Sequence, residues 1–559
     1  MARIVPEQCL QHSLIHCVDL LSAGGNRMKE RKELNIQEMT IRQKIGMTMC
    51  GHIYDCWDEA KYWANLEFVM GLIRERALGA VWVDHRYRLQ EVMDMIYETA
   101  DYPILILRDA ESGVEPYQIG RHNALGATGS EELAYAFGKI TGVMARKQGY
   151  NVICNPVLDM CHENVVCGST VRCIGGDKVK VTRLAMAEAR GLKDGGVLTV
   201  AKHYPGSVGN KDIDSHMAEK CSMESEEDLV NVNLYPYLAL NEQGLLDGIM
   251  TQHCRFPKID PVYPASLSSK VIGIIRKHGF DGMVMTDALN MMGAAAKFGK
   301  FACKGLAIGN GNDLALVWHD DEQSYNAMLE AYQHGVISDA RLDDAVRHVL
   351  AMQHKVMIKP VDAEVTQEDL EKFHRINRDG VYARADAGLD AAISRDGRHY
   401  FAVLVPSEME VNDAGKVDVD TQDKKWYQPI AIMKQLKVLF PNSDAYAIHE
   451  YPSAFENERL LERSIDYDDV VFITYMESQC YVGRECLTSR ITSLIQALQV
   501  TNRISALVHF GNPFVVEDLV HIPRVLIGGI STGSVECTLD VLAGNYPAKG
   551  VLTYDVKFQ

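Results

Sequence analysis

The pattern that most constrains the fold is a repeated alternation of short apolar runs with amphipathic stretches, from about residue 40 to residue 355. Eight runs are almost continuously hydrophobic, as strands buried on both faces of a parallel sheet are. They cover residues 47–53, 79–84, 104–109, 151–159, 197–204, 248–253, 282–287 and 312–318. Eight such strands alternating with helices predict an α/β fold of the TIM type, a (β/α)8 barrel.

Helix signals are clearest in residues 130–149, between the third and fourth runs. Ser130 stands where an N-cap is expected, two glutamates follow it, and Gly149 stands at the end. One face of this predicted helix is apolar, with Leu133, Phe137, Ile140 and Met144 at helical spacing.

A second alternating series begins near residue 400. Its apolar runs cover residues 401–406, 445–449, 470–476, 504–510 and 524–530, and five short parallel strands of this kind suit an open α/β sandwich. Residues 362–380 are rich in charge and are interpreted as a connection. We therefore predict a catalytic barrel over 1–357, an inter-domain linker over 358–399 and a C-terminal α/β sandwich domain over 400–559.

Composition narrows the classes of partner. The chain has 559 residues and a formal net charge of −18, which disfavours nucleic acid and anionic membranes as partners. No stretch approaches the roughly 18 apolar residues of a membrane span. Acidic and histidine residues interrupt residues 1–25, which therefore do not have the pattern of a signal peptide. A cytoplasmic protein is expected.

Neither cysteines nor glycine-rich turns indicate a cofactor. The fourteen cysteines are scattered, and the closest group, Cys154, Cys161, Cys167 and Cys173, lacks the C-x-x-C spacing of a structural zinc site. Free thiols are expected, and no metal site. The turn "GGISTGS" (528–534) is glycine-rich, but it lacks the lysine of a phosphate-binding P-loop and is not assigned to a nucleotide.

Polar side chains stand at the predicted carboxyl ends of the barrel strands, where active sites of such barrels form. They are Asp109, Asp159, Lys202, His203, His253 and Asp287. An acidic residue at the end of a buried strand is costly unless it is hydrogen-bonded or catalytic. The Asp287 carboxylate could act as the nucleophile of a retaining glycosidase, which also needs a proton donor.

Several donors remain open at this point: Asp109, Glu111, Asp159 and His216 could each protonate a leaving group. His216 closes the stretch "AKHYPGSVGNKDIDSHM" (201–217), two residues after Asp214. Imidazole titrates near neutrality, with an ordinary pKa of about 6.5. Asp214 could hold one ring nitrogen and direct the other toward a substrate.

Several segments together resemble family 3 glycoside hydrolases, specifically the β-N-acetylglucosaminidase branch. "GFDGMVMTDALNM" (279–291) is close to the family's "GFDGVVVTDALNM", and "KHYPGSVGNKDIDSH" (202–216) is close to "KHFPGHGDTxxDSH". Similar segments occur in the family's order at 107–113, 123–142, 155–160 and 337–355, and more weakly at 511–516.

The resemblance implies a barrel followed by an α/β sandwich, with no metal or organic cofactor and with a small carbohydrate as substrate. It implies that Asp287 attacks the anomeric carbon, and that His216, paired with Asp214, protonates the leaving group and then activates water. The residues implied to hold the sugar are Asp109, Arg172, Lys202 and His203. The expected activity is exo-acting removal of terminal β-linked N-acetylglucosamine from cell-wall or chitin fragments.

Departures from the family pattern bear on the substrate. The loop ending at His216 has one extra residue, and Cys173 and Ile174 replace a serine and a phenylalanine. Two alternatives keep the fold: a phosphorylase or β-glucosidase-like enzyme, and an inactive sugar-binding protein. An inactive copy has no chemical reason to keep Asp287, Asp214 and His216 together.

Overall fold

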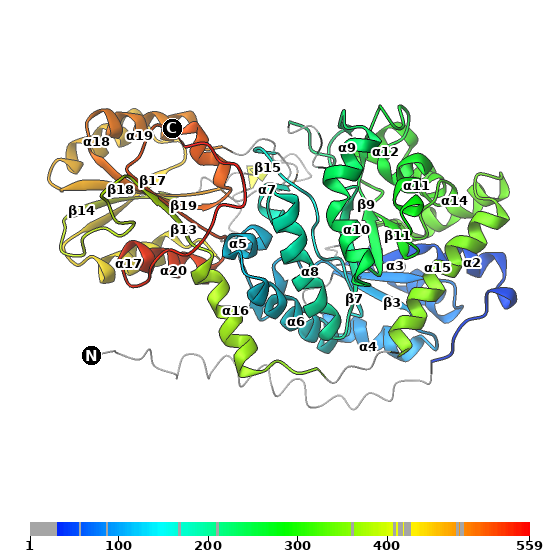
Figure 1. Ribbon diagram of the computed structural model, residues 1–559. Helices are drawn as coiled ribbons and strands as arrows, with labels where there is room; N and C mark the ends of the chain where they lie inside the picture. Colours follow the sequence, from blue (N-terminus) through cyan, green and yellow to red (C-terminus); the bar gives the residue numbers. More distant parts are fainter. Residues whose placement is uncertain are drawn as a thin grey trace.

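The computed structural model describes residues 31–54, 58–84, 88–165, 169–207, 209, 212–358, 363–405, 410–411, 417–418, 426–476, 480 and 486–558. The predictions made on residues 1–25 and on Cys167 lie outside these ranges, as do positions 208, 210 and 211 of the loop that precedes His216. Figure 1 shows a barrel and a second, separate sheet with its own helices, with α16 (Gln367–Asp379) running beside the barrel.

The barrel is one parallel sheet in the order β11-β9-β7-β6-β3-β2-β1-β12. A parallel bridge between Met285 and Leu314 joins its first and last members. Every strand overlaps one of the eight predicted runs, so the barrel prediction is confirmed. The strands are β1 (Met49–Tyr54), β2 (Ala80–Asp84), β3 (Leu105–Arg108), β6 (Val152–Ile153), β7 (Leu198–Tyr204), β9 (Gly248–Thr251), β11 (Met283–Thr286) and β12 (Ala315–Leu316).

Helices that follow these strands in the chain form the outer layer of the barrel (Figure 1). They include α3 (Glu59–Arg74), α4 (Leu89–Thr99), α6 (Glu131–Lys147), α8 (Lys178–Asp194), α10 (Tyr235–Glu242), α11 (Ser269–Lys277), α13 (Ala302–Gly309) and α15 (Asp339–Ile358). As predicted, the Ser130 side chain caps α6 by accepting a hydrogen bond from the Leu133 amide. Among the described helices, none is both long and apolar enough to cross a membrane.

The second sheet has the order β13-β20-β19-β18-β14-β17. Five of its strands occur where predicted and are parallel: β14 (His399–Val405), β17 (Asp444–His449), β18 (Asp469–Met476), β19 (Ile504–Gly511) and β20 (Arg524–Gly528). The sandwich prediction is confirmed, and the five predicted parallel strands are present, but a sixth strand that the sequence did not indicate joins them. Strand β13 (Tyr382–Ala385) pairs antiparallel with β20 at the sheet edge. It is half-buried throughout, so it shows no continuous apolar run.

The segment predicted as a linker contains β13 and the amphipathic helix α16. A capping box of Thr366 and Asp369 starts this helix, and Phe373 and Ile376 are buried on one face. The Phe373 ring is stacked on Phe137 of α6, with 6.4 Å between centroids. The charged stretch therefore packs against the barrel, while the predicted boundaries at 357/358 and 399/400 stay a prediction.

The end of the chain returns from the second sheet to the barrel. The Val551 amide donates to the Ala127 carbonyl (2.8 Å), and the Gly176 amide donates to the Thr553 carbonyl (2.9 Å). The buried Tyr554 hydroxyl contacts the carbonyl oxygens of Thr170 (2.6 Å) and Cys173 (2.7 Å). These contacts bind the second unit to the barrel segment that carries Arg172.

Candidate active site

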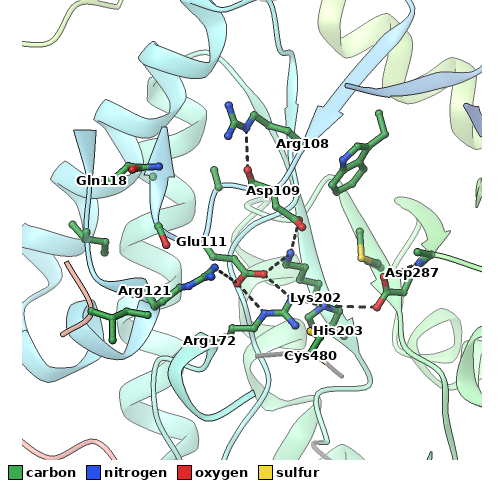
Figure 2. Close-up of a pocket in the computed structure, with 18 of the residues that line it drawn as sticks. Arg108, Asp109, Glu111, Gln118, Arg121, Arg172, Lys202, His203, Asp287 and Cys480 are labelled. Atoms are coloured by element: carbon green, nitrogen blue, oxygen red, sulfur yellow. Dashed lines mark hydrogen bonds and ion pairs between the residues drawn. The ribbon is translucent and has the colours of Figure 1, made fainter. Parts of the chain in front are cut away.

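A cavity of about 960 Å³ opens at the carboxyl ends of the barrel strands. Asp109 follows β3, Lys202 and His203 belong to β7, and Asp287 follows β11 (Figure 2). Residues of the second unit close one side of the cavity, namely Trp426, Cys480, Ile530, Ser531, Thr532 and Gly533. Six of the seven predicted site residues line it: Asp109, Arg172, Lys202, His203, His216 and Asp287.

Asp287 is held in place by the backbone around it. Its amide donates to the Thr251 carbonyl of β9 (2.9 Å), and its Oδ1 accepts a hydrogen bond from the Ala288 amide (2.7 Å). Its Oδ2 lies 3.9 Å from Nε2 of His203. Burial by itself would raise the pKa of Asp287, but nearby His203 and His253 and the Ala288 amide outweigh it and lower this pKa to about 2.

The seventh residue, Asp214, lies behind His216. Its Oδ1 accepts hydrogen bonds from the His216 amide (2.8 Å) and contacts His216 Nδ1 (2.7 Å). Burial tends to lower the pKa of His216, but the hydrogen bonds with Asp214 and with Cys480 of the second unit outweigh it and raise this pKa to about 9. His216 is therefore an imidazolium at neutral pH.

Two backbone hydrogen bonds hold this pair against the start of α12 (Met292–Phe298), the helix that follows Asp287. The Met292 amide donates to the His216 carbonyl (3.1 Å), and the Gly293 amide donates to the Ser215 carbonyl (2.8 Å). Gly293 permits the approach, because a Cβ there would lie 3.0 Å from the Ser215 oxygen. The contact between Asp214 and His216 that the sequence suggested is present, and it lies against the helix that follows Asp287.

Four charged groups converge beside Asp287. Lys202 is almost fully buried, and its Nζ contacts Asp109 Oδ1 and, at 2.7 Å, Glu111 Oε1. Arg172 donates two hydrogen bonds to Glu111, at 2.9 and 2.7 Å. Burial by itself would lower the pKa of Lys202, but Asp109 and Glu111 raise it, so the ammonium stays charged.

Two of the carboxyl groups that the sequence offered as proton donors, Glu111 and Asp159, are bound to other side chains. Burial would raise the pKa of Glu111, yet Arg172 and Lys202 hold it well below its usual range, so this carboxylate has no proton to donate. Asp159 accepts from the His203 amide (3.0 Å) and contacts His203 Nδ1 (2.6 Å). These contacts orient His203, whose Nε2 lies 3.2 Å from Arg172 Nη2.

His253, another polar strand-end residue, is buried outside the cavity wall. Its Nδ1 contacts Ser266 Oγ (2.7 Å), and its Nε2 contacts the Ala288 carbonyl (3.0 Å). It therefore supports the backbone beside Asp287 and does not reach a substrate directly.

Sequence reasoning missed the residues that come to the cavity from elsewhere. Arg121 follows the short hairpin β4–β5 (Gly113–Val114 and Tyr117–Gln118), and Trp318 follows β12. Trp318 packs edge-on against Trp82, with 5.9 Å between centroids. Cys480 and Ser531 belong to the second unit. The one available signal was the glycine-rich "GGISTGS" turn, which had no predicted partner in the barrel.

A metal role finds little support in the described residues, where one group of three could reach an ion: Asp313, Asp344 and His348. The Asp313 oxygens already pair with Arg276 (2.8 Å) and Arg341 (2.5 Å). Both oxygens of this carboxylate are therefore already paired with cationic side chains, and none of the three residues lines the cavity.

A barrel with an ionised aspartate, an imidazolium and a set of charged side chains at its strand ends has the features of a sugar-processing barrel enzyme. The model of the "Glycosyl hydrolase family 3 N terminal domain" matches residues 70–352. The chain belongs to glycosyl hydrolase family 3, as the sequence resemblance predicted, and is a glycosidase.

Individual relatives agree with this assignment. A "Beta-hexosaminidase" of Methylobacillus flagellatus is 28% identical over 325 residues, 55% of this chain and 88% of that enzyme. One of Pseudomonas aeruginosa is 31% identical over 216 residues, 38% of this chain and 63% of that enzyme. The structure of a family 3 β-N-acetylglucosaminidase from Paenibacillus matches 93% of this chain and all of that chain, with 25% identity and a TM-score of 0.75. The β-glucoside phosphorylase BglX shares the fold, at 20% identity and a TM-score of 0.76.

Proposed function

We propose that this chain is a retaining, exo-acting β-N-acetylhexosaminidase that removes terminal β-linked N-acetylglucosamine from small glycans such as cell-wall or chitin fragments. The observation that carries the proposal is that Asp287 and His216, which is paired with Asp214, line one cavity, where their surroundings lower the pKa of Asp287 and raise that of His216. A retaining glycosidase needs a nucleophile and an acid in these states. Relatives named β-hexosaminidase and β-N-acetylglucosaminidase support the choice of sugar.

In the first step, Oδ2 of Asp287 attacks the anomeric carbon, since its Oδ1 holds the Ala288 amide. The bond from that carbon to the glycosidic oxygen breaks. His216 gives its Nε2 proton to this oxygen, because Nδ1 is held by Asp214. The products are a glycosyl ester of Asp287, a free alcohol and neutral His216.

In the second step, neutral His216 takes a proton from a water molecule that attacks the anomeric carbon. The ester bond breaks, and its electron pair returns to Asp287. The sugar leaves with its original anomeric configuration, and both side chains recover their starting charge.

Asp109, Arg172, Lys202 and His203 would bind the hydroxyl groups of the sugar throughout. Their mutual ion pairs and hydrogen bonds fix them before substrate arrives, which lowers the ordering needed on binding. Glu111 positions Arg172 and Lys202 and does not itself protonate the leaving group.

Phosphorolysis is the second candidate, because His216 adds no negative charge beside Asp287. After the first step, an incoming phosphate would meet a neutral imidazole where many glycosidases present a second carboxylate. Phosphate would then replace water in the second step and release a sugar 1-phosphate.

A β-glucosidase-like sugar preference is the remaining variant, and one relative is named "Beta-N-acetylglucosaminidase/beta-glucosidase".

The test uses the full chain with 4-nitrophenyl N-acetyl-β-glucosaminide and 4-nitrophenyl β-glucoside, with and without phosphate. Asp287→Asn is compared with Asp281→Asn, a control at a fully exposed carboxylate. We expect turnover of the acetamido sugar, a loss of about 10³-fold or more in Asp287→Asn and little change in the control. A sugar 1-phosphate product favours phosphorolysis, and faster turnover of the glucoside favours the β-glucosidase variant. Binding of either sugar without turnover contradicts an enzyme and favours a sugar-binding protein.

The cytoplasmic location expected from the sequence is part of this proposal. Cell fractionation with an antibody against the chain tests it, and recovery in the culture medium or an envelope fraction contradicts it.

A further inference from the structure

One end of the cavity has a cation that the mechanism above does not use. Arg121 is the first residue of α5 (Arg121–Thr128) and lines the cavity next to Glu111 (Figure 2). Its φ is +67°, in the left-handed region that side chains other than glycine rarely adopt. Such backbone conformations persist where the surrounding structure holds them, and they cluster at functional sites.

The described residues do not saturate the Arg121 guanidinium. Among the described residues its one ionic partner is Glu111, with 3.8 Å between Nη1 and Oε2, and no hydrogen bond involves the side chain. Glu111 already accepts two hydrogen bonds from Arg172 and a contact from Lys202. A single carboxylate thus serves three cations, and Arg121 is the most distant of them. Its side chain is 38% exposed, toward the cavity.

The second unit places a helix start at the same end. Gly120 packs so closely on Gly529 and Ile530 that a Cβ there would lie 2.5 Å from the Ile530 nitrogen. This approach brings Ser531, Thr532 and Gly533 to the cavity wall, at the start of the eleven-residue helix α20 (Thr532–Leu542). The amino end of a helix carries positive potential, so it adds to the charge of Arg121. The described cavity wall has four arginines and lysines against three carboxylates, although the chain is strongly acidic.

Arg121 lies away from the reacting carbon. A series of contacts leads from Asp287 through His203, Arg172 and Glu111 to Arg121. Figure 2 shows Arg121 across Glu111 and Arg172 from Asp287. The anomeric carbon and the leaving group must lie at Asp287 and His216, so Arg121 faces the opposite end of the sugar. A cavity of about 960 Å³ is at the upper end of the ligand-pocket range, which leaves room for a substituent there.

We propose that Arg121 and the start of α20 form a subsite for a negatively charged group, such as a phosphate or sulfate, carried by the glycosyl unit at the end remote from its anomeric carbon. The inference rests on the proposed glycosidase function and adds the charge of its substrate. A guanidinium with free donors binds such oxyanions through paired, charge-assisted hydrogen bonds.

The experiment compares 4-nitrophenyl N-acetyl-β-glucosaminide with its 6-O-sulfate and 6-O-phosphate. The variants are Arg121→Gln, which removes the charge, and Arg121→Lys, which keeps it. In the wild type we expect kcat/KM for the charged glycosides to exceed that for the uncharged one by about tenfold or more, and the excess to shrink with added salt. Arg121→Gln should abolish this preference for the charged glycosides, and Arg121→Lys should retain part of it.

A second measurement keeps the two proposals separate. Isothermal titration gives the affinities of N-acetylglucosamine and its 6-phosphate for Asp287→Asn, with and without Arg121→Gln. Tighter binding of the phosphorylated sugar that depends on Arg121 supports the subsite even if neither sugar is hydrolysed, a result that contradicts only the proposed function. If the wild type hydrolyses charged and uncharged glycosides with equal kcat/KM, the subsite proposal is overturned. It is also overturned if Arg121→Gln lowers kcat/KM equally for both.

A titration with inorganic phosphate shows whether Arg121 binds a free phosphate acceptor or an anionic group on the sugar. If free phosphate speeds release of 4-nitrophenol and yields a sugar 1-phosphate in an Arg121-dependent way, Arg121 binds the acceptor. That result overturns its assignment to the glycosyl unit.

Discussion

At the scale of single residues, the proposed mechanism depends on the charges of Asp287 and His216. The pKa of Asp287 is lowered to about 2 and that of His216 is raised to about 9. The reactive combination, a carboxylate with an imidazolium, therefore exists across the whole range between these values. Burial alone would shift each pKa in the other direction. Histidines and the Ala288 amide stabilise the charged form of Asp287, and Asp214 and Cys480 stabilise the charged form of His216.

The pH profile of kcat/KM follows from these shifts. The reaction needs the His216 proton, so activity should be flat through neutral pH and fall as pH rises through about 9. Asp214→Asn replaces the charge-assisted hydrogen bond that raises the pKa of His216 with a weaker neutral one, so the alkaline limb should move to lower pH. Asp212→Asn, an exposed carboxylate in the same loop, is the matched control. An alkaline limb that stays in place in Asp214→Asn contradicts the assignment of His216 as the acid.

At the scale of elements, the close contact between the loop before α5 and the turn before α20 joins the two units at the cavity. Gly120→Ala would place a methyl group 2.5 Å from the Ile530 nitrogen, so the two backbones must separate. We expect a loss of about 1–3 kcal/mol in the free energy of unfolding, measured by urea denaturation.

The matched control for this substitution is Gly273→Ala in α11, where a Cβ meets no atom within 4 Å. This control should be neutral or gain about 0.5–1 kcal/mol from helix propensity. Equal effects of the two substitutions would show that the loop contact has no special role.

Elements with an uninterrupted apolar pattern could be predicted from the sequence. All eight barrel strands and five strands of the second sheet lie within or beside their predicted runs, because burial on both faces leaves a continuous signal. Strand β13 and helix α16 could not be recognised this way, since β13 is half-buried and α16 has a charged outer face. Motifs identified the residues around Asp287, but Arg121 and Cys480 reach the cavity only through contacts between distant segments.

At the scale of the whole molecule, the returning chain end supports the site. The Tyr554 hydroxyl contacts the carbonyl oxygens on both sides of the Val171–Arg172 pair. Tyr554→Phe would leave these buried carbonyls without that donor, which costs about 1–3 kcal/mol. We expect lower thermal stability and a higher KM, because Arg172 loses its support.

Tyr451→Phe is the control for this change, since Tyr451 is 60% exposed and away from the cavity wall. Reduced stability with unchanged KM in Tyr554→Phe would mean that the chain end supports the fold alone and leaves the placement of Arg172 unaffected.

Retention of configuration in the proposed mechanism depends on a covalent bond between Asp287 and the sugar. The most direct measurement treats the protein with 5-fluoro-N-acetyl-β-glucosaminyl fluoride, which loses fluoride on attack and whose ring fluorine slows hydrolysis of the ester. Mass spectrometry of the peptides should then find one fluorinated glycosyl unit, attached to Asp287. An adduct on another residue would contradict this mechanism. The absence of any adduct would also contradict it if the sugar released from an ordinary substrate has the inverted anomeric configuration.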